Sequence, residues 1–320
     1  MKTYVRELVA RLPCVAPEYS YVPFTDGGNF SWKEQVRLPL AIRRAKLDVM
    51  HFLSQYVPVL LPPRFLLTIH DLIHLSFPHY FKRKVGPYYA TVVRRACARA
   101  ARVITDDERT VEDLGKFLGV PRQKIRVIPL GVSEPFLGSI EPYAGQRPYL
   151  LYVGNHRVHK DLPTLFAAWS GLPPELQIDL YLTGPDDFAG ELQRRSTDFR
   201  AIVALGDVST GRLAQYYAGA LALVQPALRE GFGLPMLEAM AAGCAVVACS
   251  DAVPRALSSH VLTFGPGDVE ELRRSLVKLA VDEGLRTQVI NVGRAVARGL
   301  TWDRCARATA DVYREVLEKC

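Results

Sequence analysis

Short apolar runs alternate with longer amphipathic segments along this chain, a pattern that predicts parallel β-sheets covered by helices. In the first half, the short runs predict strands at residues 47–52, 65–69, 102–105 and 124–128. Longer segments with helical periodicity lie between them, at residues 83–100 and 111–118. The first half therefore predicts an α/β domain.

The alternation is clearer in the second half. Strands are predicted at residues 149–153, 178–183, 202–205, 221–225 and 245–248. Helices are predicted at residues 162–169 and 234–242, the second closed by Gly243, and Ser209 suits the N-cap of a further helix. This half predicts a doubly wound parallel sheet, which binds ligands at the carboxyl ends of its strands.

The length of the chain and a segment rich in proline and glycine together predict two domains. Its 320 residues exceed what one hydrophobic core usually supports, and residues 129–148 are rich in proline and glycine, as linkers are. We expect a first domain at residues 1–140 and a second at residues 141–302, with a helix at about residues 303–320 packing back on the first. The expected active site is a cleft between two such domains.

The composition, 49% hydrophobic and 23% charged, is ordinary for a globular protein in water. No apolar run reaches the roughly 18 residues of a membrane-spanning helix, and the first residues lack the apolar core of a secretory signal. The six cysteines contain no C-x-x-C pair and read as reduced thiols. We therefore expect a cytoplasmic protein, and no residue pattern calls for a metal.

Positive charge is concentrated in the first half. Residues 1–145 hold 21 Lys and Arg against 13 Asp and Glu, whereas the remainder holds 19 against 20. Between Asp71 and Asp106 there is no acidic residue, and the basic ones are Lys82, Arg83, Lys84, Arg94, Arg95, Arg99 and Arg102. This stretch could meet an anionic membrane surface at the inner face of the membrane or a phosphorylated substrate, or it could be a solvated helix. Nothing accompanies the charge that would indicate nucleic-acid binding.

The nine residues from Glu230 to Glu238, E-G-F-G-L-P-M-L-E, follow a predicted strand and open a predicted helix. Gly231 and Gly233 allow a backbone to approach a ligand closely, and the N-terminus of a helix favours a diphosphate. Glu230 can accept hydrogen bonds from sugar hydroxyls, and Glu238, about one helical turn further on, can reach a ribose. The segment predicts a site for a sugar diphosphate.

Arg157 and Lys160 lie in the loop after another predicted strand, spaced to converge on one anion. Positive charge there would stabilise a departing diphosphate as a glycosidic bond breaks. By spacing alone, they could equally be exposed basic residues of a loop.

Four segments together resemble the family 4 retaining glycosyltransferases of GT-B fold: E-G-F-G-L-P-M-L-E-A-M-A at 230–241, L-Y-V-G-N-H-R-V-H-K-D-L at 151–162, I-R-V-I-P-L-G-V at 125–132 and T-I-H-D-L-I-H-L-S-F-P at 68–78. The resemblance implies two Rossmann-like domains facing a cleft. It implies transfer of a hexosyl unit of mannose or glucose type from a GDP- or UDP-linked donor to a saccharide or lipid-linked acceptor. It implies neither a metal nor another cofactor.

The resemblance also implies roles for individual residues. The catalytic residues would be His70, Arg157, Lys160 and Glu230. The donor would be bound by Gly154, Asn155, Gly184, Asp207, Val208, Gly231, Phe232, Gly233, Leu234 and Glu238. Asp71 would lie on the acceptor side, where it could orient His70 or cap the next turn.

The chain departs from the family pattern in two places. Residues 3–12 resemble the family's first helix, so we expect the first domain to lack the opening strand and its glycine-rich loop. An alternative function follows from this, a nucleotide-sugar-binding protein that is catalytically impaired. The second departure is Asp106, Asp107 and Glu108, where relatives usually carry a small hydroxyl residue; this trio could cap the next helix.

Overall fold

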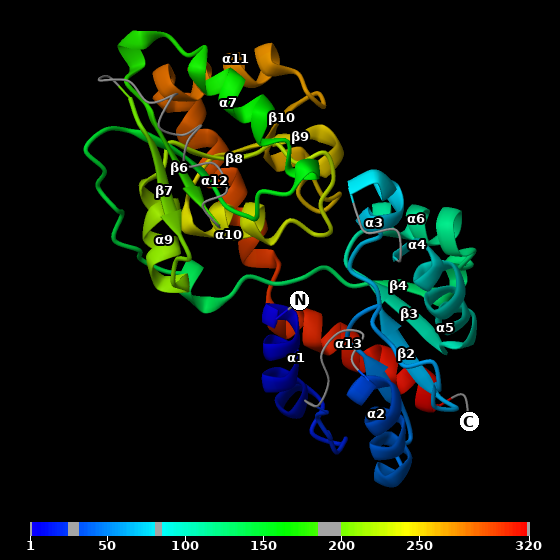
Figure 1. The fold of residues 1–320 in the computed structure, drawn as a ribbon. Coiled ribbons are helices and arrows are strands. Elements are labelled where there is room, and N and C mark those ends of the chain that lie inside the picture. Colours follow the sequence, from blue (N-terminus) through cyan, green and yellow to red (C-terminus); the bar gives the residue numbers. More distant parts are fainter. Residues whose placement is uncertain (1, 25–31, 81–84, 185–199, 319–320) are drawn as a thin grey trace. The chain divides into compact units, whose positions relative to one another are not determined.

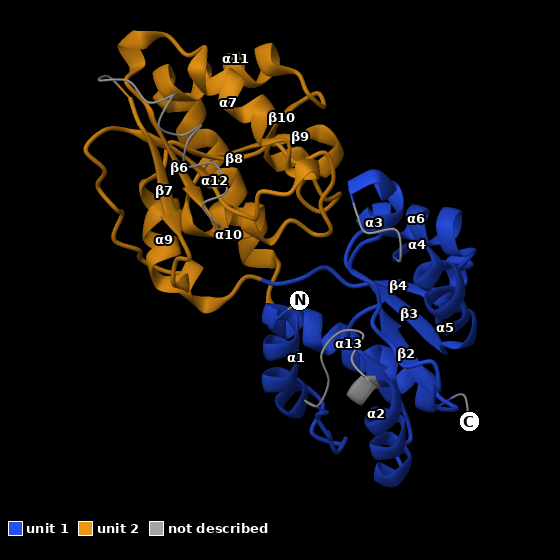
Figure 2. Ribbon diagram, viewed as in Figure 1, with its two compact units in different colours: residues 1–131, 302–320 blue, residues 132–301 orange. Residues whose placement is uncertain are grey.

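A computed structural model describes residues 2–24, 32–80, 85–184 and 200–318. The chain forms two compact units, shown in separate colours in Figure 2. Unit 1 contains Met1–Gly131 and Trp302–Cys320, and unit 2 contains Val132–Thr301. The chain thus divides after Gly131, slightly earlier than the expected boundary at residue 140.

The described part of unit 1 contains a four-stranded parallel sheet whose spatial order follows the chain, β1-β2-β3-β4 (Figure 1). Its strands are β1 (Met50–Phe52), β2 (Phe65–Thr68), β3 (Arg102–Thr105) and β4 (Ile125–Val127). Every residue of β2 is buried, as expected for a strand covered on both faces. The predicted strands of the first half are confirmed, with ends that differ by a few residues.

The helices of unit 1 are α1 (Lys2–Val15), α2 (Trp32–Ala45), α3 (Ile73–Ser76), α4 (Val85–Tyr88), a π-helical turn (Tyr89–Val93), α5 (Arg94–Arg99), α6 (Glu108–Leu118) and α13 (Trp302–Leu317). The helix predicted at residues 83–100 is thus the run from α4 to α5, and its first two residues lie outside the described part of the chain. Among described residues, no strand precedes Met50. Helix α1 occupies the first positions instead, burying Tyr4, Leu8 and Leu12 and packing against α13.

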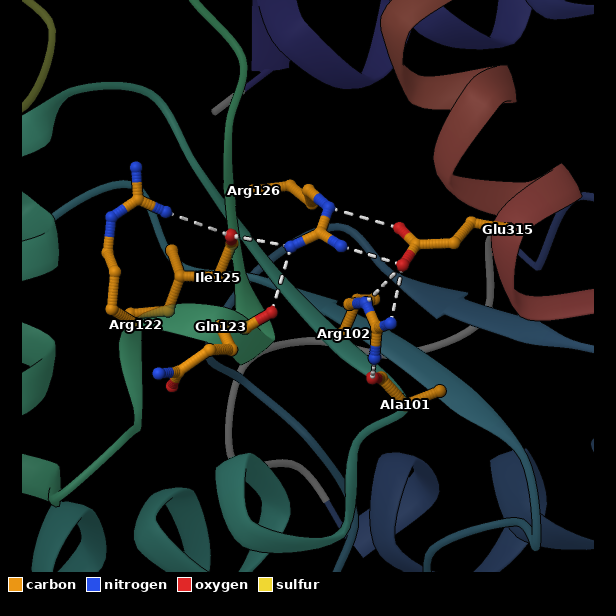
Figure 3. Close-up of polar contacts among 7 residues, drawn as sticks. All are labelled: Ala101, Arg102, Arg122, Gln123, Ile125, Arg126 and Glu315. Carbon is orange, nitrogen blue, oxygen red and sulfur yellow. Dashed lines mark hydrogen bonds and ion pairs between the residues drawn. The ribbon is translucent and has the colours of Figure 1, made fainter. Parts of the chain in front are cut away.

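One carboxylate of helix α13 joins this helix to two strands of the unit 1 sheet. Glu315 accepts hydrogen bonds from Arg102 Nε at 3.0 Å and from Arg126 Nε at 3.0 Å, so one side chain joins α13 to β3 and β4 (Figure 3). Arg126 also donates to the carbonyl oxygens of Gln123 and Ile125. Arg102 belongs to the predicted basic stretch between Asp71 and Asp106. Glu315 neutralises its charge inside unit 1, so this charge is not presented to a partner.

Unit 2 contains a six-stranded parallel sheet with the order β10-β9-β8-β5-β6-β7. Its strands are β5 (Tyr149–Tyr152), β6 (Asp179–Thr183), β7 (Ile202–Gly206), β8 (Ala222–Gln225), β9 (Val246–Cys249) and β10 (Leu262–Phe264). The helices in its described part are α7 (Leu162–Ser170), α9 (Thr210–Gly219), α10 (Leu234–Ala242), α11 (Val269–Val281) and α12 (Glu283–Gly299). The predicted doubly wound sheet is confirmed; β10, α11 and α12 were not assigned from the sequence.

The order of strands reverses between β5 and β8, because the chain builds outward from β5 on one side and returns to its other side at β8. Such a reversal opens a crevice at the carboxyl ends of the two strands, where doubly wound proteins bind ligands. The short 3₁₀ turn Val158–Lys160 and the N-terminus of α10 follow these two strands directly. Among the described helices of the whole chain, none is both long and apolar enough to cross a membrane.

Candidate active site

A cavity of about 350 Å³ lies at the carboxyl ends of β5, β6 and β7. Its lining residues are Val153, Gly154, Asn155, Thr183, Gly184, Gly206, Asp207, Val208 and Leu213. They include Gly154, Asn155, Gly184, Asp207 and Val208, which the sequence assigned to donor binding from separate segments. The fold therefore gathers these five predicted residues around one cavity.

Backbone contacts bring the walls of this cavity together. Gly184 has φ +102°, and a Cβ atom there would lie 2.4 Å from the carbonyl oxygen of Gly154, so only glycine fits. Gly154 N–H donates to Thr183 Oγ1 at 3.2 Å, and His156 Nε2 contacts the Thr183 carbonyl oxygen at 2.9 Å. The sequence indicated the glycines but not Thr183 or His156, which join loops that follow different strands.

Lys160 and Glu230 form an ion pair between Nζ and Oε1, although 70 positions separate them. Each side chain is only 11% exposed. The two loops that carry them also share a backbone hydrogen bond, from Leu228 N–H to the His159 carbonyl oxygen at 2.8 Å. The pair thus lies where the loops after β5 and β8 meet, at the reversal of strand order.

Arg157 is placed differently from Lys160. Its side chain is exposed, while its backbone N–H donates to Asn155 Oδ1 at 3.3 Å. Lys160, by contrast, is buried against Glu230, so the two basic side chains lie in different surroundings. The spacing of the two residues did not reveal this difference in burial.

The turn after Glu230 leads into the N-terminus of α10. Gly233 is the N-cap residue in the left-handed region, with φ +69°, which favours glycine. Phe232 is buried in the core, and Pro235 in the first turn has no N–H group to leave unpaired. The backbone of this turn therefore sits at the positive end of a nine-residue helix, an arrangement suited to an anion.

Glu238 lies one turn inside α10 and accepts a hydrogen bond from the Tyr217 hydroxyl of α9 at 3.4 Å. Burial raises the pKa of Glu238 to about 7, against the opposing effect of that hydrogen bond. Tyr217 itself is fully buried. Tyr217 therefore packs in the core and also contacts a predicted donor-binding carboxylate.

In unit 1, His70 follows β2 and contacts Asp106, which follows the neighbouring strand β3; the distance from Nδ1 to Asp106 Oδ2 is 2.6 Å. Asp71 Oδ1 accepts a hydrogen bond from Ile73 N–H at 3.1 Å, so Asp71 caps the next turn. Asp107 is the N-cap residue of α6 and accepts from Arg109 N–H. The acidic trio thus contains the expected cap and also a partner for His70 that the sequence did not indicate.

Two family descriptions match this chain. "Glycosyltransferase Family 4" matches residues 4–134, and "Glycosyl transferases group 1" matches residues 147–282. The O-antigen chain mannosyltransferase B of Escherichia coli is 27% identical over 291 residues, which cover 86% of this chain and 76% of that protein.

Solved structures share the fold at low identity. Sucrose-phosphate synthase from Thermosynechococcus elongatus has a TM-score of 0.74 at 21% identity, covering 94% of this chain and 82% of that one. The Anabaena protein HepE, solved in complex with UDP-glucose, has a TM-score of 0.69 at 15% identity, covering 90% and 84%. Two Rossmann-like parallel sheets and these likenesses define a protein of the GT-B class. With both family matches, the chain belongs to the family 4 glycosyltransferases.

Proposed function

We propose that this chain is a retaining hexosyltransferase that moves a mannosyl or glucosyl unit from a nucleoside-diphosphate sugar to a saccharide or lipid-linked acceptor. The main support for this proposal is the buried Lys160–Glu230 pair at the reversal of strand order, beside the N-terminus of α10, which favours an anion. The similarity to a bacterial mannosyltransferase and the fold shared with a UDP-glucose-binding protein support this proposal.

The donor would lie along the carboxyl edge of the unit 2 sheet. Its base would enter the cavity lined by Gly206, Asp207 and Val208, and its ribose hydroxyls would bond to Glu238. Its sugar would meet Glu230 and the backbone of the turn Gly231–Leu234. The phosphates would bind Lys160 and the N-terminus of α10, with the exposed Arg157 free to turn toward them.

In the transfer step, the bond between sugar C1 and the diphosphate oxygen breaks, and the acceptor hydroxyl oxygen bonds to C1 on the same face. The electron pair leaves with the diphosphate, whose departing oxygen takes up the proton that the acceptor hydroxyl loses. Lys160 would stabilise the charge that develops on the leaving group, which lets side chains provide what a metal provides in other transferases. Before the donor binds, Glu230 holds this ammonium group inside the site.

The proposal is tested by measuring donor binding and transfer separately. Calorimetric titration with GDP-mannose and UDP-glucose, with ATP as control, should show selective binding of one nucleoside-diphosphate sugar. Incubation of that donor with oligosaccharide and lipid-linked acceptors should then yield a product with retained anomeric configuration. Absence of binding by every donor contradicts the proposal, and tight binding without transfer or donor hydrolysis supports the catalytically impaired binding protein instead.

We further propose that unit 1 contacts an anionic membrane surface through α2, where it would meet a lipid-linked acceptor at the inner face of the membrane. The exposed face of α2 carries Val36 and Leu40, the latter 51% exposed, together with Arg37, Arg43 and Arg44. A hydrogen bond from Val59 N–H to Gln35 Oε1 joins this helix to a loop whose Val59 and Leu60 are also exposed. Apolar side chains among arginines suit the interface of an anionic bilayer.

The predicted basic stretch contributes less to such a surface than its charge suggested. Arg94, Arg95 and Arg99 are exposed on α5, but Arg102 pairs with Glu315. Lys82, Arg83 and Lys84 lie outside the described residues. Helix α2 combines exposed charge with exposed apolar side chains, and it is therefore the better candidate.

A further inference from the structure

We propose that Asp106 is a positioning residue that holds His70 as an imidazolium, with both ring N–H groups donated to oxygen acceptors. This inference deepens the proposed function and rests on it only for the identity of the substrate. Because β2 and β3 are neighbouring parallel strands, the residues that follow them, His70 and Asp106, meet at one edge of the sheet.

The partners of the His70 ring are the main evidence. Nδ1 lies 2.6 Å from Asp106 Oδ2, and Nε2 lies 3.3 Å from the carbonyl oxygen of Leu53. Burial raises the pKa of Asp106, whereas the charge and hydrogen bond of His70 act in the opposite direction. An ionised Asp106 and a carbonyl can only accept hydrogen bonds, so beside the carboxylate both contacts are satisfied together when both ring nitrogens carry protons. A neutral ring beside the ionised carboxylate would turn one nitrogen lone pair toward an oxygen lone pair.

The neighbouring buried histidine provides a comparison within the same structure. His51 Nδ1 lies 2.7 Å from the Tyr313 hydroxyl, and His51 Nε2 lies 2.8 Å from Thr68 Oγ1. Hydroxyls can donate or accept, so a neutral His51 satisfies both contacts. Burial, and then the charge of His70, lower the pKa of His51 to about 3. The positive charge of this histidine pair therefore belongs on His70.

The surroundings of His70 keep the ion pair away from water. Asp106 is 2% exposed, the His70 side chain is 14% exposed, and the ring of Tyr4 on α1 lies edge-to-face with His70 at 4.6 Å. Among the described residues, the other titratable groups near the pair are Asp71 in the same loop, Cys305 on α13, Tyr4 on α1 and His51 on β1. Burial alone would lower the pKa of His70, but the charge and hydrogen bond of Asp106 outweigh burial and raise it.

The consequence for the proposed reaction is a positive charge on His70 that persists above the ordinary histidine pKa. A histidine whose two N–H groups are both engaged cannot serve as a general base in this state. It can stabilise negative charge near its ring, and Asp106 determines that property without touching the substrate.

The test is ¹⁵N NMR of histidine-labelled full-length protein between pH 6 and 9, with the His70 signals assigned from an H70Q sample. In the wild type, both nitrogens should stay protonated well above the ordinary histidine pKa of about 6.5. Asp106→Asn should let the ring become neutral at a lower pH, whereas Asp106→Glu should largely restore the imidazolium. Asp107→Asn, which alters the cap of α6 and leaves the contact between Asp106 and His70 in place, is the matched control.

In transfer assays, Asp106→Asn should lower kcat by roughly 10- to 100-fold with little change in donor KM, and should shift the alkaline limb of the pH profile. A neutral His70 at pH 7 in the wild type overturns the proposal. An unchanged titration of His70 in Asp106→Asn, or full activity of that variant, overturns it as well. The NMR measurement requires no turnover. If His70 is an imidazolium but the protein transfers no sugar, the missing transfer contradicts the proposed function, and the NMR result still supports the assigned role of Asp106.

Discussion

At the scale of single residues, the Lys160–Glu230 pair has two consequences. Two charges that are both 11% exposed stabilise each other, so removing one leaves the other poorly solvated. In the proposed reaction, a donor phosphate would replace Glu230 as the partner of Lys160 and would release the carboxylate for the sugar hydroxyls. The pair thus keeps both groups positioned before the donor arrives.

We predict that Lys160→Ala lowers kcat by roughly 10²- to 10³-fold, because the ammonium would stabilise the departing diphosphate. Steady-state transfer assays with the donor identified by calorimetry measure this change. Lys278→Ala, at an exposed position of α11, is the control and should leave the rate unchanged. A rate for Lys160→Ala within about twofold of the wild type would remove Lys160 from the catalytic residues.

The raised pKa of Glu238, about 7, predicts that donor affinity depends on pH. In the proposed complex, ribose hydroxyls would donate to the carboxylate, so binding would favour the ionised form and release a proton near neutrality. Affinity should therefore rise as pH increases through about 7 and fall below it. Calorimetry at pH 6, 7 and 8 measures the trend.

Glu238→Gln separates this effect from other titrations. The variant should bind the donor roughly 10- to 100-fold more weakly, the equivalent of one lost charge-assisted hydrogen bond, and its affinity should be nearly flat across the same pH range. Retention of the wild-type pH dependence in this variant would show that another group is responsible.

At the scale of elements, helix α13 contributes to unit 1 although it follows all of unit 2 in the chain. Its carboxylate Glu315 joins Arg102 and Arg126 at the start of β3 and in β4 (Figure 3). Tyr313 of the same helix bonds to His51 of β1. Helix α13 thereby links three strands of the sheet that carries His70.

We predict that Glu315→Ala destabilises unit 1 by about 1–3 kcal/mol, because two partly buried guanidinium groups lose their shared acceptor. Chemical denaturation followed by circular dichroism measures the change. Arg314→Ala on the same helix removes exposed pairs with Asp311 and Glu18 and should have no measurable effect. Equal stabilities of the two variants would show that the Glu315 network does not hold α13 in place.

At the scale of the whole molecule, the proposed contact between α2 and an anionic bilayer predicts that the protein binds anionic vesicles. Arg43→Glu with Arg44→Glu should reduce co-sedimentation with phosphatidylglycerol-containing vesicles by at least about tenfold, since each basic residue near an anionic surface contributes about 1 kcal/mol. Vesicles of phosphatidylcholine alone should not bind the wild type. The paired control, Arg94→Glu with Arg95→Glu on α5, should bind nearly as well as the wild type. The opposite ranking of the two variants would move the contact from α2 to α5.

The elements and motifs that could be predicted are those encoded by neighbouring residues. Apolar periodicity located the strands of both sheets apart from β10, and the E-G-F-G-L-P segment indicated a turn and a helix N-terminus at Gly233, where the structure has them. β10 was missed because it is short and only one of its three residues is buried. The sequence placed Arg157 correctly in a loop. Its spacing from Lys160 did not predict that its side chain is exposed, because exposure follows from packing.

The sequence by itself determined the parallel α/β character of both units, the turn before α10 and the family resemblance, because periodicity, glycine positions and local motifs depend on residues close along the chain. Tertiary structure alone decided which distant side chains meet. Lys160 with Glu230, His70 with Asp106 and Glu315 with two arginines are paired by strand order and helix docking. Burial, the physical origin of the raised pKa of Glu238, also exists only once the helices cover the sheet.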